Sequence, residues 1–132
     1  MNNNFAMYSS RMADDLFKIL EINLEETSEV ERQIISAFAF GMINAYAMEE
    51  KVEPATVHGV TIGILINEFK YSEKQASEFT QTLINSTNRE YHPTMYTIIH
   101  RGIQAYYDYK NAKEKEVYDN LTYIIDTIVS KK

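Results

Sequence analysis

The stretch SEVERQIISAFAFGMINAYA, residues 28–47, decides the fold of this chain. Ser28 and Glu31 have the spacing of a capping box, in which each side chain accepts a hydrogen bond from the other residue's backbone N–H at the start of a helix. Apolar residues then recur at helical spacing, and they are Val30, Ile34, Ala37, Phe38, Gly41, Met42, Ala45 and Tyr46. Phe40 and Ile43 widen this face, so we expect a helix that is buried on more than one side.

Similar signals predict the other helices. Four of the other expected starts carry a capping residue or a first-turn proline, and these residues are Ser10, Pro54, Ser72 with Gln75, and Pro93. Ser10 is expected to cap a helix over residues 11–24, and an apolar stripe predicts a last helix over residues 112–129. The chain has only two prolines and four glycines, with no linker or repeat. We therefore predict an all-α fold, a single compact bundle of about six helices in which residues 1–132 form one domain.

The segment Val57–Phe69 is the least certain part of this prediction because it is apolar nearly all round and rich in β-branched residues. Such a run fits a buried strand as well as a helix. We favour a central buried helix, since a lone strand among helices would have no pairing partner. Gly59 and Gly63 would then lie on adjacent turns, where small residues allow a second helix of the same chain to cross closely.

Composition and charge exclude several classes of protein. The 132-residue chain is 45% hydrophobic and 24% charged, as globular domains are, and it has no cysteine for disulfides, thiol catalysis or metal binding. Its start lacks the features of a secretory signal, and its most apolar run, VTIGILI, is too short to span a membrane. We expect a cytoplasmic protein with no membrane partner.

The formal net charge of −6 is unevenly distributed. Residues 1–53 contain ten acidic and four basic residues, whereas residues 54–132 contain nine of each. Such an acidic half repels nucleic acid and favours a basic partner. The simpler alternative is a solvated acidic surface that keeps the protein soluble.

No pattern of catalytic or metal-binding residues stands out. The three histidines, His58, His92 and His100, lack the spacing of a metal site, and no G-x-S-x-G or phosphate-binding glycine loop is present. The serines at 10, 28 and 72 are explained as helix caps. We therefore predict no catalytic residue, no metal, no cofactor and no nucleic-acid partner, and conclude that the protein is not an enzyme.

The stretch YHPTMYTIIHRGIQAYYDY, residues 91–109, has the composition of a recognition surface, with two histidines, one arginine and five tyrosines. A helical wheel places His100 at the edge of the apolar arc beside Tyr96 and Tyr107, while Arg101 faces outward. Tyrosine suits both core edges and interfaces. His100 could equally be a hydrogen-bonded edge residue, with Arg101 paired to a nearby acid.

Four segments together resemble a family of small bacterial immunity proteins from polymorphic toxin systems, the family numbered forty-eight. They are FAFGMINAYA (38–47), VHGVTIGILINEF (57–69), YSEKQASEFTQTLI (71–84) and HPTMYTIIHRGIQAYYDY (92–109), so the resemblance covers residues 28–110. It implies an all-α cytoplasmic protein that binds a co-encoded toxin and blocks it. The family supplies no residue roles.

Three functional hypotheses follow. The first is an immunity protein that neutralises a basic toxin, such as a nuclease, by stoichiometric binding. The anchors we predict for it are Tyr96, His100, Arg101 and Tyr107, with a charged rim of Glu25, Glu26, Glu49, Glu50 and Glu53. The second is a non-enzymatic regulatory or scaffolding module, which could be a homodimer. The third is a small-ligand-binding bundle with His100 in its pocket.

Overall fold

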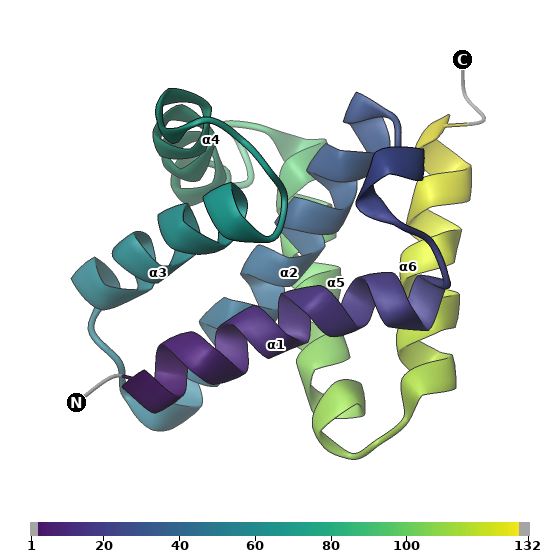
Figure 1. Ribbon diagram of the computed structural model, residues 1–132, viewed down its shortest axis with the longest axis horizontal. Coiled ribbons are helices and arrows are strands. Elements are labelled where there is room, and N and C mark those ends of the chain that lie inside the picture. The colour runs from purple at the N-terminus through teal and green to yellow at the C-terminus, as the bar shows by residue number, and fades with distance from the viewer. Residues whose placement is uncertain (1–2, 130–132) are drawn as a thin grey trace.

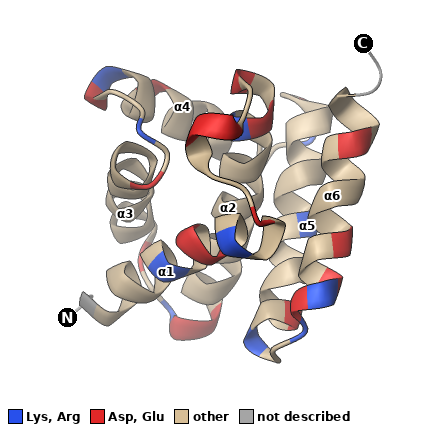
Figure 2. Cartoon of the chain, turned by 45° about the vertical axis from the view of Figure 1, so that its right-hand side comes forward, with Lys and Arg blue, Asp and Glu red and all other residues tan. Residues whose placement is uncertain are grey.

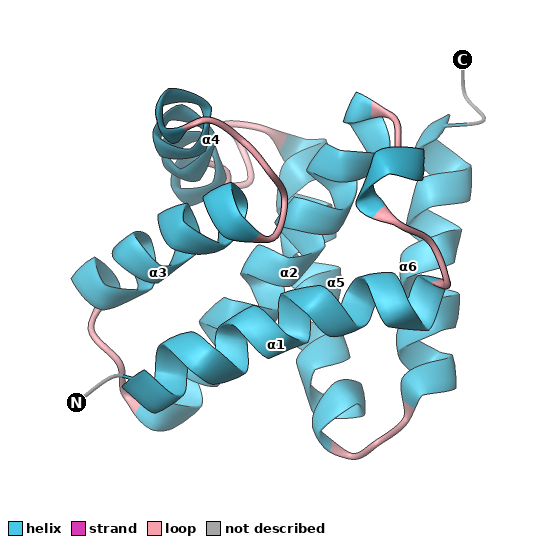
Figure 3. Ribbon diagram, viewed as in Figure 1, coloured by secondary structure: helices cyan, strands magenta, loops and turns pink. Residues whose placement is uncertain are grey.

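The computed structural model describes residues 3–129 and confirms the all-α class (Figures 1 and 3). Within that range the elements are the helices α1 (Asn3–Leu20), α2 (Glu29–Glu50), α3 (Pro54–Asn67), α4 (Glu73–Asn85), α5 (Pro93–Lys110) and α6 (Glu114–Val129), with a 3₁₀ turn, η1 (Leu24–Glu26), before α2. The described residues contain no strand, so the strand alternative for Val57–Phe69 is wrong.

Helix α2 is the centre of the fold, and twelve of its residues are buried. It begins with the predicted capping box: the Glu31 N–H donates to the Ser28 hydroxyl at 3.1 Å, and the Ser28 N–H donates to the Glu31 carboxylate at 2.8 Å. Buried residues run almost without a break from Ile34 to Ala47. The expected burial on more than one side is therefore confirmed.

Helices α2 and α5 touch backbone to backbone. A Cβ atom added to Gly41 would overlap the carbonyl oxygen of Ile99, and one added to Gly102 would overlap that of Phe38. Further along the two helices, the Tyr106 hydroxyl and the Lys110 ammonium both donate to the carboxylate of Glu49, each at 2.6 Å. These contacts make a continuous seam, which we call the α2–α5 seam.

The remaining helices surround this pair, as Figure 1 shows. Helices α1 and α6 pack on α2 and on each other, while α3 packs on α1, α2 and α4. Helix α3 is thus peripheral, and the prediction that it is central is wrong, because α2 already fills the centre. Only Val57, Thr61, Ile64 and Leu65 of α3 are buried. Helix α3 is apolar nearly all round because it contacts α1, α2 and α4 on different sides, each of them only in part.

The predicted close crossing at Gly59 and Gly63 is also wrong. A Cβ atom at either position would have no heavy atom within 4 Å apart from the chain neighbours and the helix's own backbone. The glycines that permit a crossing are Gly41 and Gly102, which lie on different helices.

Helix starts and ends differ from expectation in two ways. Helix α1 already includes Asn3, so Ser10 is an interior residue whose hydroxyl donates to Glu68 at 2.6 Å, and its predicted role as a cap is wrong. Shortly after the last residue of α1, α2 and α5, a residue other than glycine adopts a positive φ: Glu21 (58°), Lys51 (57°) and Ala112 (61°). Each is followed by the backbone hydrogen bond of a Schellman motif, for example Ile22 N–H to Phe17 C=O at 3.2 Å.

Candidate partner-binding surfaces

Two of the four predicted anchors lie side by side on α5. Pro93 occupies the first turn, and the Nδ1 atom of His92 caps it by accepting from the Met95 N–H at 3.2 Å. One turn further, the rings of Tyr96 and His100 are 4.1 Å apart between centroids, and His100 is exposed. Tyr107 is seven residues beyond His100 on the same side of the helix and is 47% exposed. Its ring packs edge-on against the ring of Tyr106, with 5.1 Å between the centroids.

Arg101 does not face outward as predicted. Its guanidinium donates to the side-chain oxygen of Asn120 at 2.8 Å, and the Asn120 side-chain amide donates back to the Arg101 carbonyl at 3.2 Å. The guanidinium carbon also lies 5.0 Å from the ring centroid of Tyr123. Arg101 therefore joins α5 to α6, and its partner is an amide rather than an acid. The wheel placed it outward because it could not include a second helix.

The predicted acidic rim divides into two separate groups. Glu25 and Glu26 lie in η1, before α2 begins, whereas Glu49 and Glu50 end that helix and Glu53 precedes α3. Because α2 has 22 residues, about 33 Å separates its ends. Figure 2 shows acidic residues at both ends of α2.

Glu49 differs from the other predicted rim residues because its carboxylate already has two internal donors. The hydrogen bond from Lys110, followed by that from Tyr106, lowers the pKa of Glu49 below its ordinary value. Glu49 therefore helps close the α2–α5 seam. Glu50 and Glu53 lie at the same corner and are exposed.

A cluster of tyrosines beside Glu49 was not predicted as a unit. The rings of Tyr8 and Tyr46 lie 4.6 Å apart, and those of Tyr46 and Tyr106 lie 5.9 Å apart. The Tyr109 hydroxyl donates to Asp15 at 2.6 Å. Burial is the main cause that raises the pKa of all four phenols, and carboxylates nearby raise it further. The cluster unites α1, α2 and α5, so no local pattern in the sequence could have revealed it.

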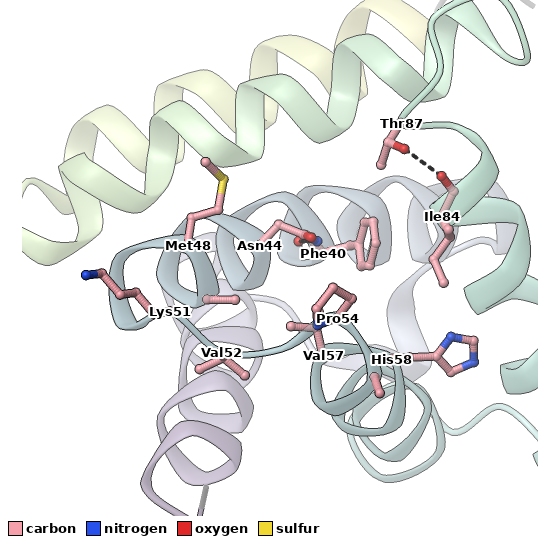
Figure 4. Close-up of a pocket in the computed structure, with 12 residues that line it drawn as sticks. Phe40, Asn44, Met48, Lys51, Val52, Pro54, Val57, His58, Ile84 and Thr87 are labelled. Atoms are coloured by element: carbon pink, nitrogen blue, oxygen red, sulfur yellow. Dashed lines mark hydrogen bonds between the residues drawn. The ribbon is translucent and has the colours of Figure 1, made fainter.

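A groove of about 690 Å³ lies between the C-terminal half of α2, the start of α3 and the end of α4 (Figure 4). Its walls are mainly apolar, and the exposed side chain of Met48 is at one end. Lys51 and His58 are the only titratable residues among its lining residues. The histidine in this groove is therefore His58, not His100 as the small-ligand hypothesis supposed.

Within residues 3–129, no group of three or more His, Asp or Glu residues is placed to hold a metal ion. No helix in the same range is long and apolar enough to cross a bilayer.

Comparison with protein families gives a match between residues 5–129 and the family described as Immunity protein 48. The match covers α1 from residue 5 onward and the whole of α2 to α6, and it extends beyond the range 28–110 that the sequence motifs suggested. No curated protein and no solved structure is similar enough to count as a match. Because the family match covers nearly the whole chain, the protein belongs to the Immunity protein 48 family.

Proposed function

We propose that this protein neutralises a co-encoded bacterial toxin by binding it stoichiometrically in the cytoplasm of the producing cell. The observation that carries this proposal is the family match over residues 5–129. On this proposal the protein acts by covering part of the toxin, and it converts no substrate.

The surface supports a role in protein recognition. Several large apolar side chains are strongly exposed, and they are Met7, Met48, Tyr91, Tyr107, Tyr118 and Tyr123. Aromatic side chains offer a large contact area with few rotatable bonds, so they are common anchors of interfaces. The net charge of −6 favours a basic toxin and would speed encounter with it.

The anchors predicted on α5 remain part of the proposal, in a form that the geometry makes easier to test. Tyr96, His100 and Tyr107 share one side of the helix, so the triple alanine variant removes their combined surface. Arg101→Ala is a poorer probe because it also breaks the contact with Asn120 on α6. Of the acidic rim, Glu50 and Glu53 can be changed with less risk to the fold than Glu49, which has two internal donors.

The direct test is co-expression with the toxin encoded next to this gene, followed by pull-down and by a growth assay of toxin-expressing cells. We expect a one-to-one complex and restored growth. A regulatory or scaffolding module would leave the toxin unbound and the cells unprotected, which would contradict the proposal. If the wild type protects and the Tyr96, His100 and Tyr107 alanine variant protects equally, the toxin binds elsewhere on the molecule.

A further inference from the structure

Two grooves of about 430 Å³ each lie along the junction of α1 and α3. The first is lined by Met7 and Ser10 of α1 and by Gly59, Val60, Gly63 and Ile64 of α3. The second lies at the C-terminal end of α1, against η1 and the end of α3. The hydrogen bond from Ser10, in the first groove, to Glu68, in the second, links α1 to the end of α3 where the two grooves adjoin.

The α1 residues that line the two grooves show that the grooves lie end to end. These residues recur every three or four positions and therefore share one side of the helix; they are Ala6, Met7, Ser10, Asp14, Phe17, Lys18 and Glu21. From Ala6 to Leu20, the last residue of α1, the helix rises about 21 Å. We call this pair of adjoining grooves the α1–α3 trough, and Figure 1 shows its two helices side by side.

One end of the trough is apolar and allows close approach. Gly59 and Gly63 leave open space where side chains would stand, since a Cβ at either would meet nothing within 4 Å. Met7 on the opposite wall is 66% exposed. An apolar helix face could therefore lie unusually near the α3 backbone here.

The other end combines an apolar floor with an acidic edge. Phe17, Ile22 and Leu24 form the floor, and the acidic residues at the edge are Asp14, Glu21, Glu25 and Glu68. The one basic lining residue, Lys18, already lies 3.3 Å from Asp14 and 3.9 Å from Asp15. Glu21 and Glu25 are exposed, and neither forms an ion pair within residues 3–129.

This combination fits lysine and arginine side chains. Both carry an aliphatic stem that can lie on apolar surface while the charged head reaches a carboxylate. The backbone conformation at the end of α1 positions these residues. The Schellman motif there brings Phe17 and Ile22 together and places Glu21 at positive φ.

We propose that the α1–α3 trough receives an amphipathic helix of the toxin, about four turns long. Its apolar face lies against Gly59 and Gly63, and lysine or arginine residues at one of its ends lie over Glu21 and Glu25. This inference rests on the proposed function and names the surface that would perform it. A second copy of this chain, with the same net charge of −6, is a poorer match for the acidic end than a basic segment is.

The sharpest test uses a variant that should fill the trough without harming the fold. Gly63→Leu places a bulky side chain in open space and replaces a helical glycine, so the isolated protein should be at least as stable as the wild type. We expect it to weaken binding to the toxin domain encoded next to this gene by at least about tenfold. The matched control is Ser77→Leu at an exposed position within α4, which should change the affinity less than about twofold.

A second pair of variants tests the acidic end. Glu21→Lys with Glu25→Lys should weaken toxin binding by about tenfold or more and reduce its dependence on salt. Lysine is tolerated at position 21, because Lys51 and Lys70 already adopt positive φ. Glu78→Lys with Glu90→Lys makes the same charge change at exposed sites outside the trough and should have a much smaller effect.

The outcomes separate this inference from the proposed function. If the wild type binds the toxin and both the Gly63→Leu and the Glu21, Glu25 variants bind equally well, the trough is not the site although the function stands. An equal loss of toxin affinity in the Glu21, Glu25 variant and in the Glu78, Glu90 control would show a general effect of net charge. That result would also overturn the inference. If the wild type is a dimer that Gly63→Leu makes monomeric, the trough is occupied by a second copy instead. A wild type that neither binds the toxin nor protects cells overturns both proposals.

Discussion

The four glycines of this chain divide into two pairs with opposite surroundings. Gly41 and Gly102 lie on different helices and allow α2 and α5 to touch, whereas Gly59 and Gly63 lie on one helix and border open space. The pair with the recognisable spacing is the pair without a packing partner. Glycine spacing within a helix therefore shows where a close approach is permitted, and only the tertiary structure shows whether a helix of the same chain makes it.

The largest expected effect is on the buried pair. Gly41→Ala or Gly102→Ala would place a methyl group on a carbonyl oxygen of the opposite helix, and the backbone cannot move aside as a flexible side chain could. We expect each change to destabilise the fold by about 3 kcal/mol or more, the upper end of the range for overpacked cores. Urea denaturation measures this directly. A decrease in the free energy of unfolding of less than about 1 kcal/mol would show that the α2–α5 seam adjusts easily. It would also contradict the proposed difference between the buried and the exposed glycine pairs.

The exposed pair should respond with the opposite sign. Gly59→Ala and Gly63→Ala remove the conformational cost of glycine within a helix and meet no neighbouring atom. Each should stabilise the isolated protein by roughly 0.5–1 kcal/mol. Denaturation of the single and double variants, measured beside Gly41→Ala, gives the comparison in one experiment. A stabilised double variant that also binds the toxin less well would show that these glycines serve the trough and not the fold.

The next change extends the comparison of the two glycine pairs by introducing a glycine at a position with positive φ. Ala112, two residues after the end of α5, has a φ of 61°, a conformation that glycine adopts without strain, yet no glycine of the chain has a positive φ. Ala112→Gly should stabilise the fold by roughly 0.5 kcal/mol, since relief of strain exceeds the added freedom of the unfolded chain. Thermal unfolding can detect this small gain. Lys113→Gly, one residue beyond, is the control and should give no gain.

Local signals predicted much of the fold. The capping boxes at Ser28 and Ser72 and the proline at the start of α5 appear as expected, because hydrogen bonds within four residues determine them. Several helix ends could not be predicted, since Glu21, Lys51 and Ala112 occupy positions that glycine usually marks. The peripheral position of α3 results from competition with α2 for the centre of the core. The apolar pattern of a single helix gives no information about such competition.

The candidate surfaces were predictable to a smaller extent. The neighbouring positions of Tyr96 and His100 followed from helical periodicity, since they are one turn apart. The direction of Arg101 did not, because its partner Asn120 is on another helix. The trough was missed for the same reason: its acidic edge joins residues of α1 and η1 to Glu68 at the end of α3.

The smallest expected effect concerns the polar end of the α2–α5 seam, where Glu49 accepts from Tyr106 and Lys110. These hydrogen bonds lower the pKa of Glu49 in the folded protein. The stability they contribute is therefore present above the ordinary glutamate pKa of about 4.3 and is lost as the pH falls through the lowered value. Wild-type stability should decrease more steeply than that of Glu49→Gln on acidification from pH ~6 to ~3, with Glu50→Gln following the wild type. Parallel curves for wild type and Glu49→Gln in urea denaturation would mean that solvent screens the contact fully, and that the buried contacts of α2 and α5 hold the two helices together without it.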